Sequence, residues 1–270
     1  MPHALLHTAE RLRYDETHGH ITWTPPVGET RVIAGIQDAL EAIAGLERGF
    51  NADVVGLGLH ALILTLRARR SYPSDVARGA MIQAAETLRD AIHPQYGPIL
   101  DQALAIADSA LLTGNDAIEA LTAFTNDAIA RLDRAAERCG RRAAALLDEN
   151  DFLQIIGAGA ALRWMLQTAI DQGIVLRIAD TDRRDEATVC VVAGAYALLN
   201  GDIAGVHPAE VAIVAAVRQR GAPVYALAPD GPTAAASPGA RIPAQCINAI
   251  VTDRGIYRPE RIAAYHHLSP

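Results

Sequence analysis

Aromatic residues are scarce in this sequence, where Phe, Trp and Tyr together make up 4% of 270 residues. Half of the residues are nevertheless hydrophobic, so Ala, Ile, Leu and Val have to build the core. A core of this composition favours helices packed on a parallel sheet. The length suits two domains, or a single large one, with ample buried volume.

Cysteine is also rare, and no two cysteines are close together. Cys139, Cys190 and Cys246 form no CxxC pair, which argues against a metal knuckle and suits a reducing cytoplasm. We therefore expect a cytoplasmic protein without a metal site. Cys190 lies inside an apolar segment, where a core residue is a better interpretation than a nucleophile.

An excess of positive charge is missing as well. The net charge is −7 and the pI is about 5.7, which argues against a general nucleic-acid interface. The arginines in 67–70, 138–142 and 183–184 are most simply solvated faces. No apolar run reaches the length of a membrane span, and the first residues do not resemble a signal peptide. We expect a small-molecule ligand as partner, and neither nucleic acid nor membrane.

The chain divides into two parts of different pattern. Residues 12–24 predict a short β-hairpin. From Thr30, a possible helix cap, to about residue 147, apolar residues recur at helical spacing. The pattern changes at Asp148–Asp151. We predict a helical domain with a short N-terminal hairpin over residues 1–148 and a Rossmann-like α/β domain over 149–270.

The second part predicts a doubly wound parallel sheet. Strands are expected at 152–156, 174–180, 188–194, 222–229 and 247–253, with helices between several of them. Ligands of such sheets bind where the strands end at their carboxyl side. The segments expected there are 157–159, 180–184, 196–207, 229–233 and 253–257.

The stretch LLNGDIAGVHPAEV (198–211) holds two candidate catalytic residues. Asp202 could exchange protons with a substrate hydroxyl or carbonyl. Alternatively, Asn200, Gly201 and Asp202 form an ordinary polar turn. His207 could share protons with Asp202 or contact an anion at a helix N-terminus, or it is a loop histidine before a proline.

Two further groups follow predicted strands. Asp180, Asp182 and Arg183 could reach the same edge, where Arg183 would bind a phosphate or carboxylate; a solvated turn or a salt bridge between the domains is the alternative. Gly157 and Gly159 belong to a short glycine loop that opens a helix and could present N–H groups to an anion, or simply form a tight turn.

A dinucleotide cofactor is only weakly indicated by this glycine loop. Leu162 stands where the fingerprint has its third glycine, although Asp180 lies roughly where a ribose-binding acid would. We expect no cofactor.

Several motifs occur in order between Gly194 and Tyr265: NGD, GAPVYALAP and INAIVTDRGIYRP. They resemble the C-terminal part of the family that contains 5-methylthioribose-1-phosphate isomerase, ribose-1,5-bisphosphate isomerase and the alpha, beta and delta subunits of initiation factor 2B. Weaker likeness extends upstream through LRYDETHGHITW, ERGFNADVVGLGLHALIL, SYPSDVARGA, FLQIIGAGAAL and ADTDRR.

The resemblance implies a helical N-terminal domain, a Rossmann-like C-terminal domain and a homodimer. It places Arg48 and Gly49 on the phosphate-loop positions and Asp202 on the position of the catalytic acid. The sequence around Arg48, taken alone, predicts only a charged residue at the end of a helix.

Departures from the family pattern accompany these matches. Ile156 stands at the position of the catalytic cysteine, and Gly205-Val206 replaces an Asn-Lys pair that contacts substrate. Tyr72 stands where the family has an arginine, and Tyr196 stands where it has an acid. About one strand–helix unit of the family is absent. The chain resembles a diverged, shortened member that lacks the cysteine.

Two functions remain open. The first is an aldose–ketose isomerase for a small sugar phosphate or related polyol, with its site between the domains and Asp202 as acid/base. His207 or Asp182 would then replace the cysteine, and substrate would bind to Arg48, Gly49, Gly157, Gly159, Arg183 and Asn200. The second is a non-catalytic metabolite-binding or regulatory protein like the initiation-factor subunits. The few anion-binding residues favour a ligand with one phosphate or none.

Overall fold

The computed structural model describes residues 7–15, 18–46, 49–179, 186–234 and 239–267. Their contacts form two compact units: Met1–Leu46 with Asn51–Asp133, and Glu47–Phe50 with Arg134–Pro270. The division falls inside helix α6 (Ala117–Ala144), because the last turns of α6 pack on the sheet of the second unit. The predicted boundary between residues 148 and 149 instead lies between the end of α6 and the first strand of the second unit's sheet.

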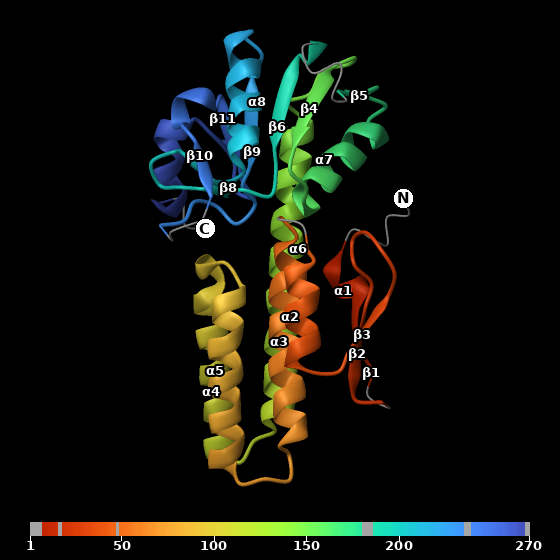
Figure 1. The fold of residues 1–270 in the computed structure, drawn as a ribbon, viewed down its shortest axis with the longest axis vertical. Coiled ribbons are helices and arrows are strands. Elements are labelled where there is room, and N and C mark those ends of the chain that lie inside the picture. Colours follow the sequence, from red (N-terminus) through yellow and green to blue (C-terminus); the bar gives the residue numbers. More distant parts are fainter. Residues whose placement is uncertain (1–6, 16–17, 47–48, 180–185, 235–238, 268–270) are drawn as a thin grey trace. The chain divides into compact units, whose positions relative to one another are not determined.

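The first unit begins with a small antiparallel sheet of order β1-β2-β3 (Figure 1). After helix α1 (Thr8–Arg11), strands β1 (Leu12–Asp15) and β2 (His20–Trp23) form the predicted hairpin. Strand β3 (Arg31–Ile33) pairs with β2. The prediction that a helix starts at Thr30 is therefore wrong: β-branched residues favour the strand there, and the helix begins only after Gly35.

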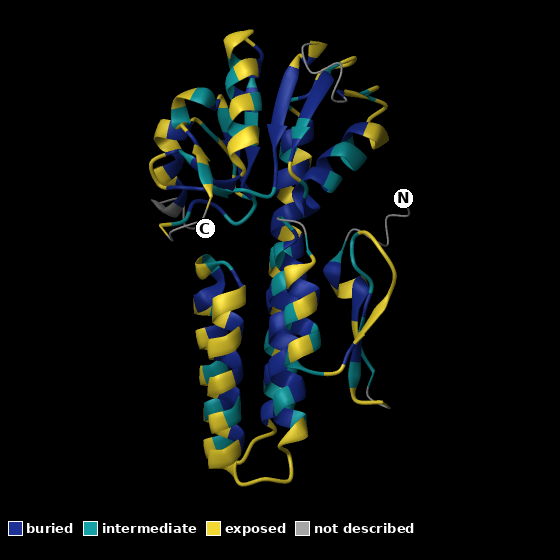
Figure 2. Cartoon of the chain, viewed as in Figure 1, coloured by how far each residue is buried: buried dark blue, intermediate teal, exposed yellow. Residues whose placement is uncertain are grey.

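Helices make up the rest of the first unit, as predicted. They are α2 (Ile36–Ala44), α3 (Asn51–Ala68), α4 (Ser74–Ala91), the 3-10 helix η2 (Pro94–Tyr96), α5 (Gly97–Thr113) and the first part of α6. Helix α3 is buried along most of its length (Figure 2), whereas α4 and α5 each bury one face. The continuous apolar stretch of α3 thus occupies the centre of the unit.

A buried ion pair joins the hairpin to the helices. The Arg11 guanidinium donates to both carboxylate oxygens of Asp53, and the contact to Oδ2 is 2.7 Å long. The indole Nε1 of Trp23 and the hydroxyl of Thr8 also donate to Asp53. Asp53 is 0% and Arg11 is 3% exposed. Since removal of one partner would leave the other charge buried, this network fixes the hairpin on α3.

The second unit contains a six-stranded sheet of order β12-β11-β9-β6-β4-β5. Its parallel strands are β5 (Arg177–Ile178), β4 (Phe152–Ile156), β6 (Val189–Val192), β9 (Val224–Leu227) and β11 (Ala249–Val251), and β12 (Ile256–Tyr257) is antiparallel at one edge. Together with helices α7 (Ala160–Asp171) and α8 (Pro208–Gln219), this confirms the predicted Rossmann-like class.

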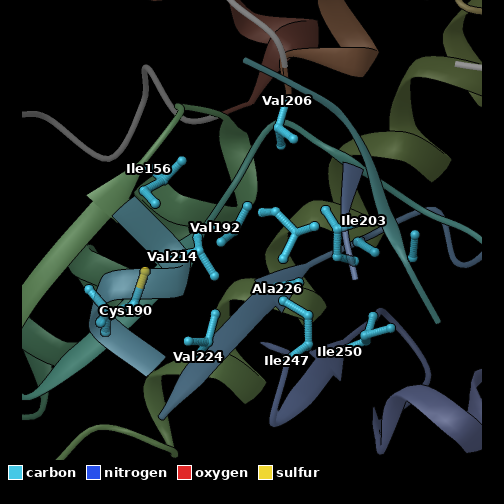
Figure 3. Packing of buried hydrophobic residues seen from close by; sticks show 14 of the residues in the cluster. Ile156, Cys190, Val192, Ile203, Val206, Val214, Val224, Ala226, Ile247 and Ile250 are labelled. Atoms are coloured by element: carbon cyan, nitrogen blue, oxygen red, sulfur yellow. The ribbon is translucent and has the colours of Figure 1, made fainter. Parts of the chain in front are cut away.

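One row of side chains shows how the sheet builds its core. Ile156, Val192, Ala226 and Ile250 are register partners across four strands, and each is at most 4% exposed. They belong to one apolar cluster with Val214 of α8 (Figure 3). Because side chains alternate along a strand, the next row faces the opposite side, which α6 reaches.

The edge strand β5 is much shorter than the predicted strand 174–180. Within its described residues 174–179, strand pairing with β4 is limited to Arg177 and Ile178, and Val175 and Ile178 are 59% and 57% exposed. The apolar run suggested burial, but a strand at the end of a sheet has a partner on one side only.

The segment 196–207 was predicted to be a loop, which is also wrong. Strand β7 (Tyr196–Ala197) pairs with β8 (Ile203–Val206), which in turn pairs with β10 (Ala240–Ile242) in a second, three-stranded sheet. All four residues of β8 are buried. Gly205, which stands where the related family has the first residue of an Asn-Lys pair, has φ +79° at an irregularity in the pairing with β10, as a glycine in a β-bulge does.

Close packing of α6 on α7 gives a first prediction. A Cβ on Gly140 would lie 2.5 Å from the carbonyl oxygen of Ala161 and 2.8 Å from the amide of Met165. We expect Gly140→Ala to lower the free energy of unfolding by about 1–3 kcal/mol, measured by urea denaturation. Gly79→Ala in α4 is the control, since nothing lies within 4 Å of its Cβ; it should stabilise by about 0.5–1 kcal/mol. Equal effects of the two variants would contradict this packing.

The buried ion pair gives a second prediction. Asp53→Asn leaves the Arg11 charge in the interior without its partner, so we expect a loss of about 3–5 kcal/mol in the free energy of unfolding. Asp127→Asn is the control: its carboxylate pairs with Arg131 over 3.5 Å on the surface, and its loss should cost less than about 1 kcal/mol. Guanidinium denaturation of both variants measures the difference, and a mild effect of Asp53→Asn would refute the network's role.

Candidate functional site

Four glycines lie together where β4 and β6 end. A Cβ on Gly49 would lie 2.4 Å from the carbonyl oxygen of Ala158, 2.7 Å from the Cα of Gly194 and 3.0 Å from that of Gly159. Gly49, Gly159 and Gly194 have φ of +93°, +149° and +67°, a region where only glycine is unstrained. We call Gly49, Gly157, Gly159 and Gly194 the glycine junction.

Gly157 completes this junction. Its φ is +75°, and a Cβ there would lie 2.2 Å from the carbonyl oxygen of Ala193. Gly157 is exposed, Gly49 and Gly194 are half-buried and Gly159 is buried, so solvent reaches the backbone of the junction mainly at Gly157. The structure thus brings together Gly49, Gly157 and Gly159, three of the predicted binding residues.

Helix α7 begins at this junction without a side-chain cap. The amide of Ala160 donates to the carbonyl oxygen of Gly49 over 3.1 Å. Arg163, in the first turns of α7, places its guanidinium 5.2 Å from the centre of the Phe50 ring. Sequence reasoning missed Arg163, because only the fold brings the residue after Gly49 next to α7. Backbone N–H groups and a guanidinium are suited to bind an anion.

Asp202 lies in the turn between β7 and β8. Its Oδ1 accepts the amide of Ala244 and its Oδ2 accepts the side-chain amide of Asn200, each over 2.9 Å. Its own amide donates to Asn200 Oδ1. Asn200 and Asp202, both predicted site residues, are therefore in contact. A carboxylate held by two donors is oriented, and both of its oxygens are engaged: one by Asn200 within the turn and one by Ala244, which lies far along the chain.

His207 caps helix α8. Its Nδ1 accepts the amide of Ala209 over 3.2 Å, and Glu210 accepts the His207 amide, which forms a capping box. His207 and Asp202 flank β8 at its opposite ends, because residues 203–206 form a strand rather than a loop. The structure does not bring these two predicted catalytic residues together.

Ile156 occupies the position where the resemblance places the catalytic cysteine. Its side chain is 4% exposed and packs in the apolar cluster near Val192 (Figure 3). Cys190 lies in the same cluster, and burial raises the pKa of its thiol to about 12. Cys139 in α6 donates to the carbonyl oxygen of Val251, and burial raises its pKa too. These two thiols are therefore protonated and poorly nucleophilic at neutral pH.

The carboxyl end of β11 carries a polar cluster. Asp253 accepts the hydroxyl of Tyr265 over 2.9 Å and the guanidinium of Arg138 over 3.1 Å. The guanidinium of Arg254 lies 4.5 Å from the centre of the Tyr265 ring, and that ring also packs on Gly231. Burial raises the pKa of Tyr265, assisted by its hydrogen bond to Asp253. This cluster holds the C-terminal 3-10 helix η5 (Pro259–His267) on the sheet.

Several predicted site residues lie outside the described residues: Arg48, Asp180, Asp182 and Arg183. Tyr72 stands where the related family has an arginine. It follows the C-terminal end of α3. That helix has 18 residues and is about 27 Å long, so Tyr72 and Asn51 lie at its opposite ends.

Among the described residues, no group of three or more His, Cys, Asp or Glu side chains is arranged to hold a metal ion. Within the same part of the chain, no helix combines the length and apolar character needed to cross a membrane.

Comparison with known proteins gives a fold but no close relative. No protein-family model matches the sequence, and no curated protein does. Among solved structures, 5-methylthioribose 1-phosphate isomerase from Pyrococcus horikoshii has a TM-score of 0.72 and 14% identity, covering 98% of this chain and 97% of that one.

Subunits of translation initiation factor eIF-2B are similar as well. The delta subunit from A. fulgidus has a TM-score of 0.64 and 13% identity, covering 93% of this chain and 96% of that one. The beta–delta complex from C. thermophilum has a TM-score of 0.58 and 12% identity, covering 86% and 93%. The chain thus has the fold shared by this isomerase and these subunits, as the motifs predicted.

The capping role of His207 can be tested. His207→Ala should lower the free energy of unfolding by about 1 kcal/mol through loss of the cap, whereas Ser at this position should largely restore it. Thermal unfolding followed by circular dichroism measures both. If ligand binding or turnover collapses in His207→Ser although stability is kept, His207 acts in chemistry rather than as a cap.

Proposed function

We propose that this protein binds a small phosphorylated sugar or polyol at the glycine junction and acts as a non-catalytic, regulatory protein. The observation that carries the proposal is the meeting of Gly49, Gly157, Gly159 and Gly194 at the carboxyl ends of β4 and β6. Doubly wound sheets bind ligands at this edge, and glycine lets a ligand approach the backbone closely.

The positive groups at the junction support an anionic ligand. Helix α7 starts there without a side-chain cap, and Arg163 lies on its first turns. A helix N-terminus and a guanidinium both favour a phosphate. Leu162 stands where a dinucleotide-binding fingerprint has its third glycine, so a compact phosphate ester is favoured over a dinucleotide.

In the part of the chain that the structure describes, the candidate acid–base residues are not brought together as a pair, which favours binding over turnover. Isomerisation of an aldose needs groups that move a proton between neighbouring carbons and oxygens of the substrate. Ile156 has no titratable group, His207 caps α8, and Asp202 already accepts two hydrogen bonds. The isomerase and the initiation-factor subunits share this fold, and the described residues resemble a binding site more than a catalytic one.

The second candidate is an aldose–ketose isomerase that uses Asp202. One observation favours it: the carboxylate is half-buried and held in one orientation by Asn200 and Ala244, as a positioned acid/base would be. Asp182 would then have to supply the second proton-transferring group.

Titration with ribose 1-phosphate separates these functions. We expect the amide NMR signals of Gly157, Gly159 and Gly194 to shift in a saturable way, with ribose as the unphosphorylated control. Ribose 1,5-bisphosphate should bind no more tightly than the monophosphate, because few anion-binding groups are available. Formation of a ketose is followed in the same samples by ¹³C NMR.

The outcomes are distinct. Saturable shifts at the glycine junction without ketose support the regulatory protein. Ketose formation that Asp202→Asn abolishes, and that the surface variant Asp127→Asn does not, supports the isomerase. The absence of any shift at the glycine junction would overturn the proposed binding site.

A further inference from the structure

A pocket of about 360 Å³ lies within the first unit, at the end of the helices remote from Asn51. It is enclosed by the C-terminal end of α3, the first turn of α4 and the junction between α5 and α6. Figure 1 shows the α3–α4 and α5–α6 connections together at the lower end of the view. We call it the loop-end pocket.

The floor of the loop-end pocket is apolar and its rim is polar. Leu66, Ala77 and Ala117 line it and are at most 6% exposed, whereas Arg69 and Arg70 are exposed on the rim. Small-molecule sites combine an apolar lining with a few polar groups, and their volumes begin at about 300 Å³. The loop-end pocket therefore has the size and lining for one small metabolite.

Positive charge dominates the rim. Neither Arg69 nor Arg70 forms an ion pair with any described residue, unlike Arg78 and Arg89 on the neighbouring helix, which pair with Asp108 and Asp101. The Arg69 guanidinium lies 5.2 Å from the centre of the Tyr72 ring, which restricts its orientation. Two guanidinium groups beside one pocket are suited to bind an oxyanion through paired N–H donors.

The acid on the rim does not cancel this charge. Asp116 uses its Oδ1 to accept the amides of Ile118 and Glu119, over 2.9 and 3.1 Å. The carboxylate thereby caps helix α6 and offsets the positive end of that helix dipole. On the opposite wall, Ser74 adds a hydroxyl at the start of α4, whose N-cap residue Pro73 makes no side-chain hydrogen bond.

We propose that the loop-end pocket binds a small metabolite that carries a phosphate or carboxylate group. Arg69 and Arg70 bind the anionic group, and Leu66, Ala77 and Ala117 contact the rest of the ligand. Such a ligand contacts the α3–α4 connection and the α5–α6 junction at once, so it stabilises the first unit by binding the folded state only. This site is separate from the glycine junction, which belongs to the second unit.

Calorimetry and NMR on the full-length chain test this site. Inorganic phosphate and malonate serve as probes, which distinguishes a phosphate ligand from a carboxylate ligand. We expect at least one of them to shift the amide signals of Ser74, Gly114 and Asn115 in a saturable way. The double variant Arg69→Ala/Arg70→Ala should weaken this binding at least about tenfold, because charge-assisted hydrogen bonds are lost.

Arg131→Ala is the matched control, since Arg131 is an exposed arginine of α6 that pairs with Asp127 outside the pocket. It should bind both probes as the unchanged protein does. The proposal is overturned if the double variant keeps the affinity, if Arg131→Ala loses it equally, or if neither probe shifts the three amides. Shifts at Gly157 and Gly159 alone would report on the glycine junction and count against the loop-end pocket.

Discussion

The backbone contact between Gly49 and the segment after β4 is the constraint on which the second unit depends. The chain approaches so closely there that any Cβ on Gly49, Gly157 or Gly159 would lie within 3 Å of a carbonyl oxygen. This contact draws residues 49–50 into a unit made otherwise of residues after 133. It also places the Gly49 carbonyl on the first turn of α7. The same absence of side chains that permits the packing exposes backbone to a ligand.

Several polar side chains that the sequence offers for catalysis also complete turns and helix ends. Asp202 and Asn200 form hydrogen bonds with each other in one turn, and Asp202 also accepts the amide of Ala244 from a distant segment. The first amides of a helix have no partner within the helix. At the start of α8, His207 accepts one of them, and Glu210 accepts the amide of His207 itself. Unpaired polar groups are costly in a protein, so residues suited to proton transfer are equally suited to finish turns and helices.

In each unit, one aromatic side chain meets charged groups at a contact that small hydrophobic residues would not orient. In the first unit, Trp23 and Arg11 meet on Asp53, which orients the hairpin on α3. In the second, Tyr265 links Asp253, Arg254 and Gly231, which holds the last 3-10 helix. Directional hydrogen bonds thus specify contacts that Ala, Leu and Val would leave interchangeable.

By itself the sequence determined the order of hairpin, helices and alternating strands, because apolar periodicity reports which faces are buried. It also predicted that Gly49, Gly157 and Gly159 belong to one site, through the family resemblance for Gly49 and through the short glycine loop that opens a helix for Gly157 and Gly159. Only the tertiary structure shows what surrounds Asp202 and Ile156, because the amide of Ala244 and most of the apolar core cluster come from residues far along the chain. Arg163, Arg69 and Arg70 likewise gained their significance only from the neighbours that the fold gives them, because local sequence carries no record of long-range contacts.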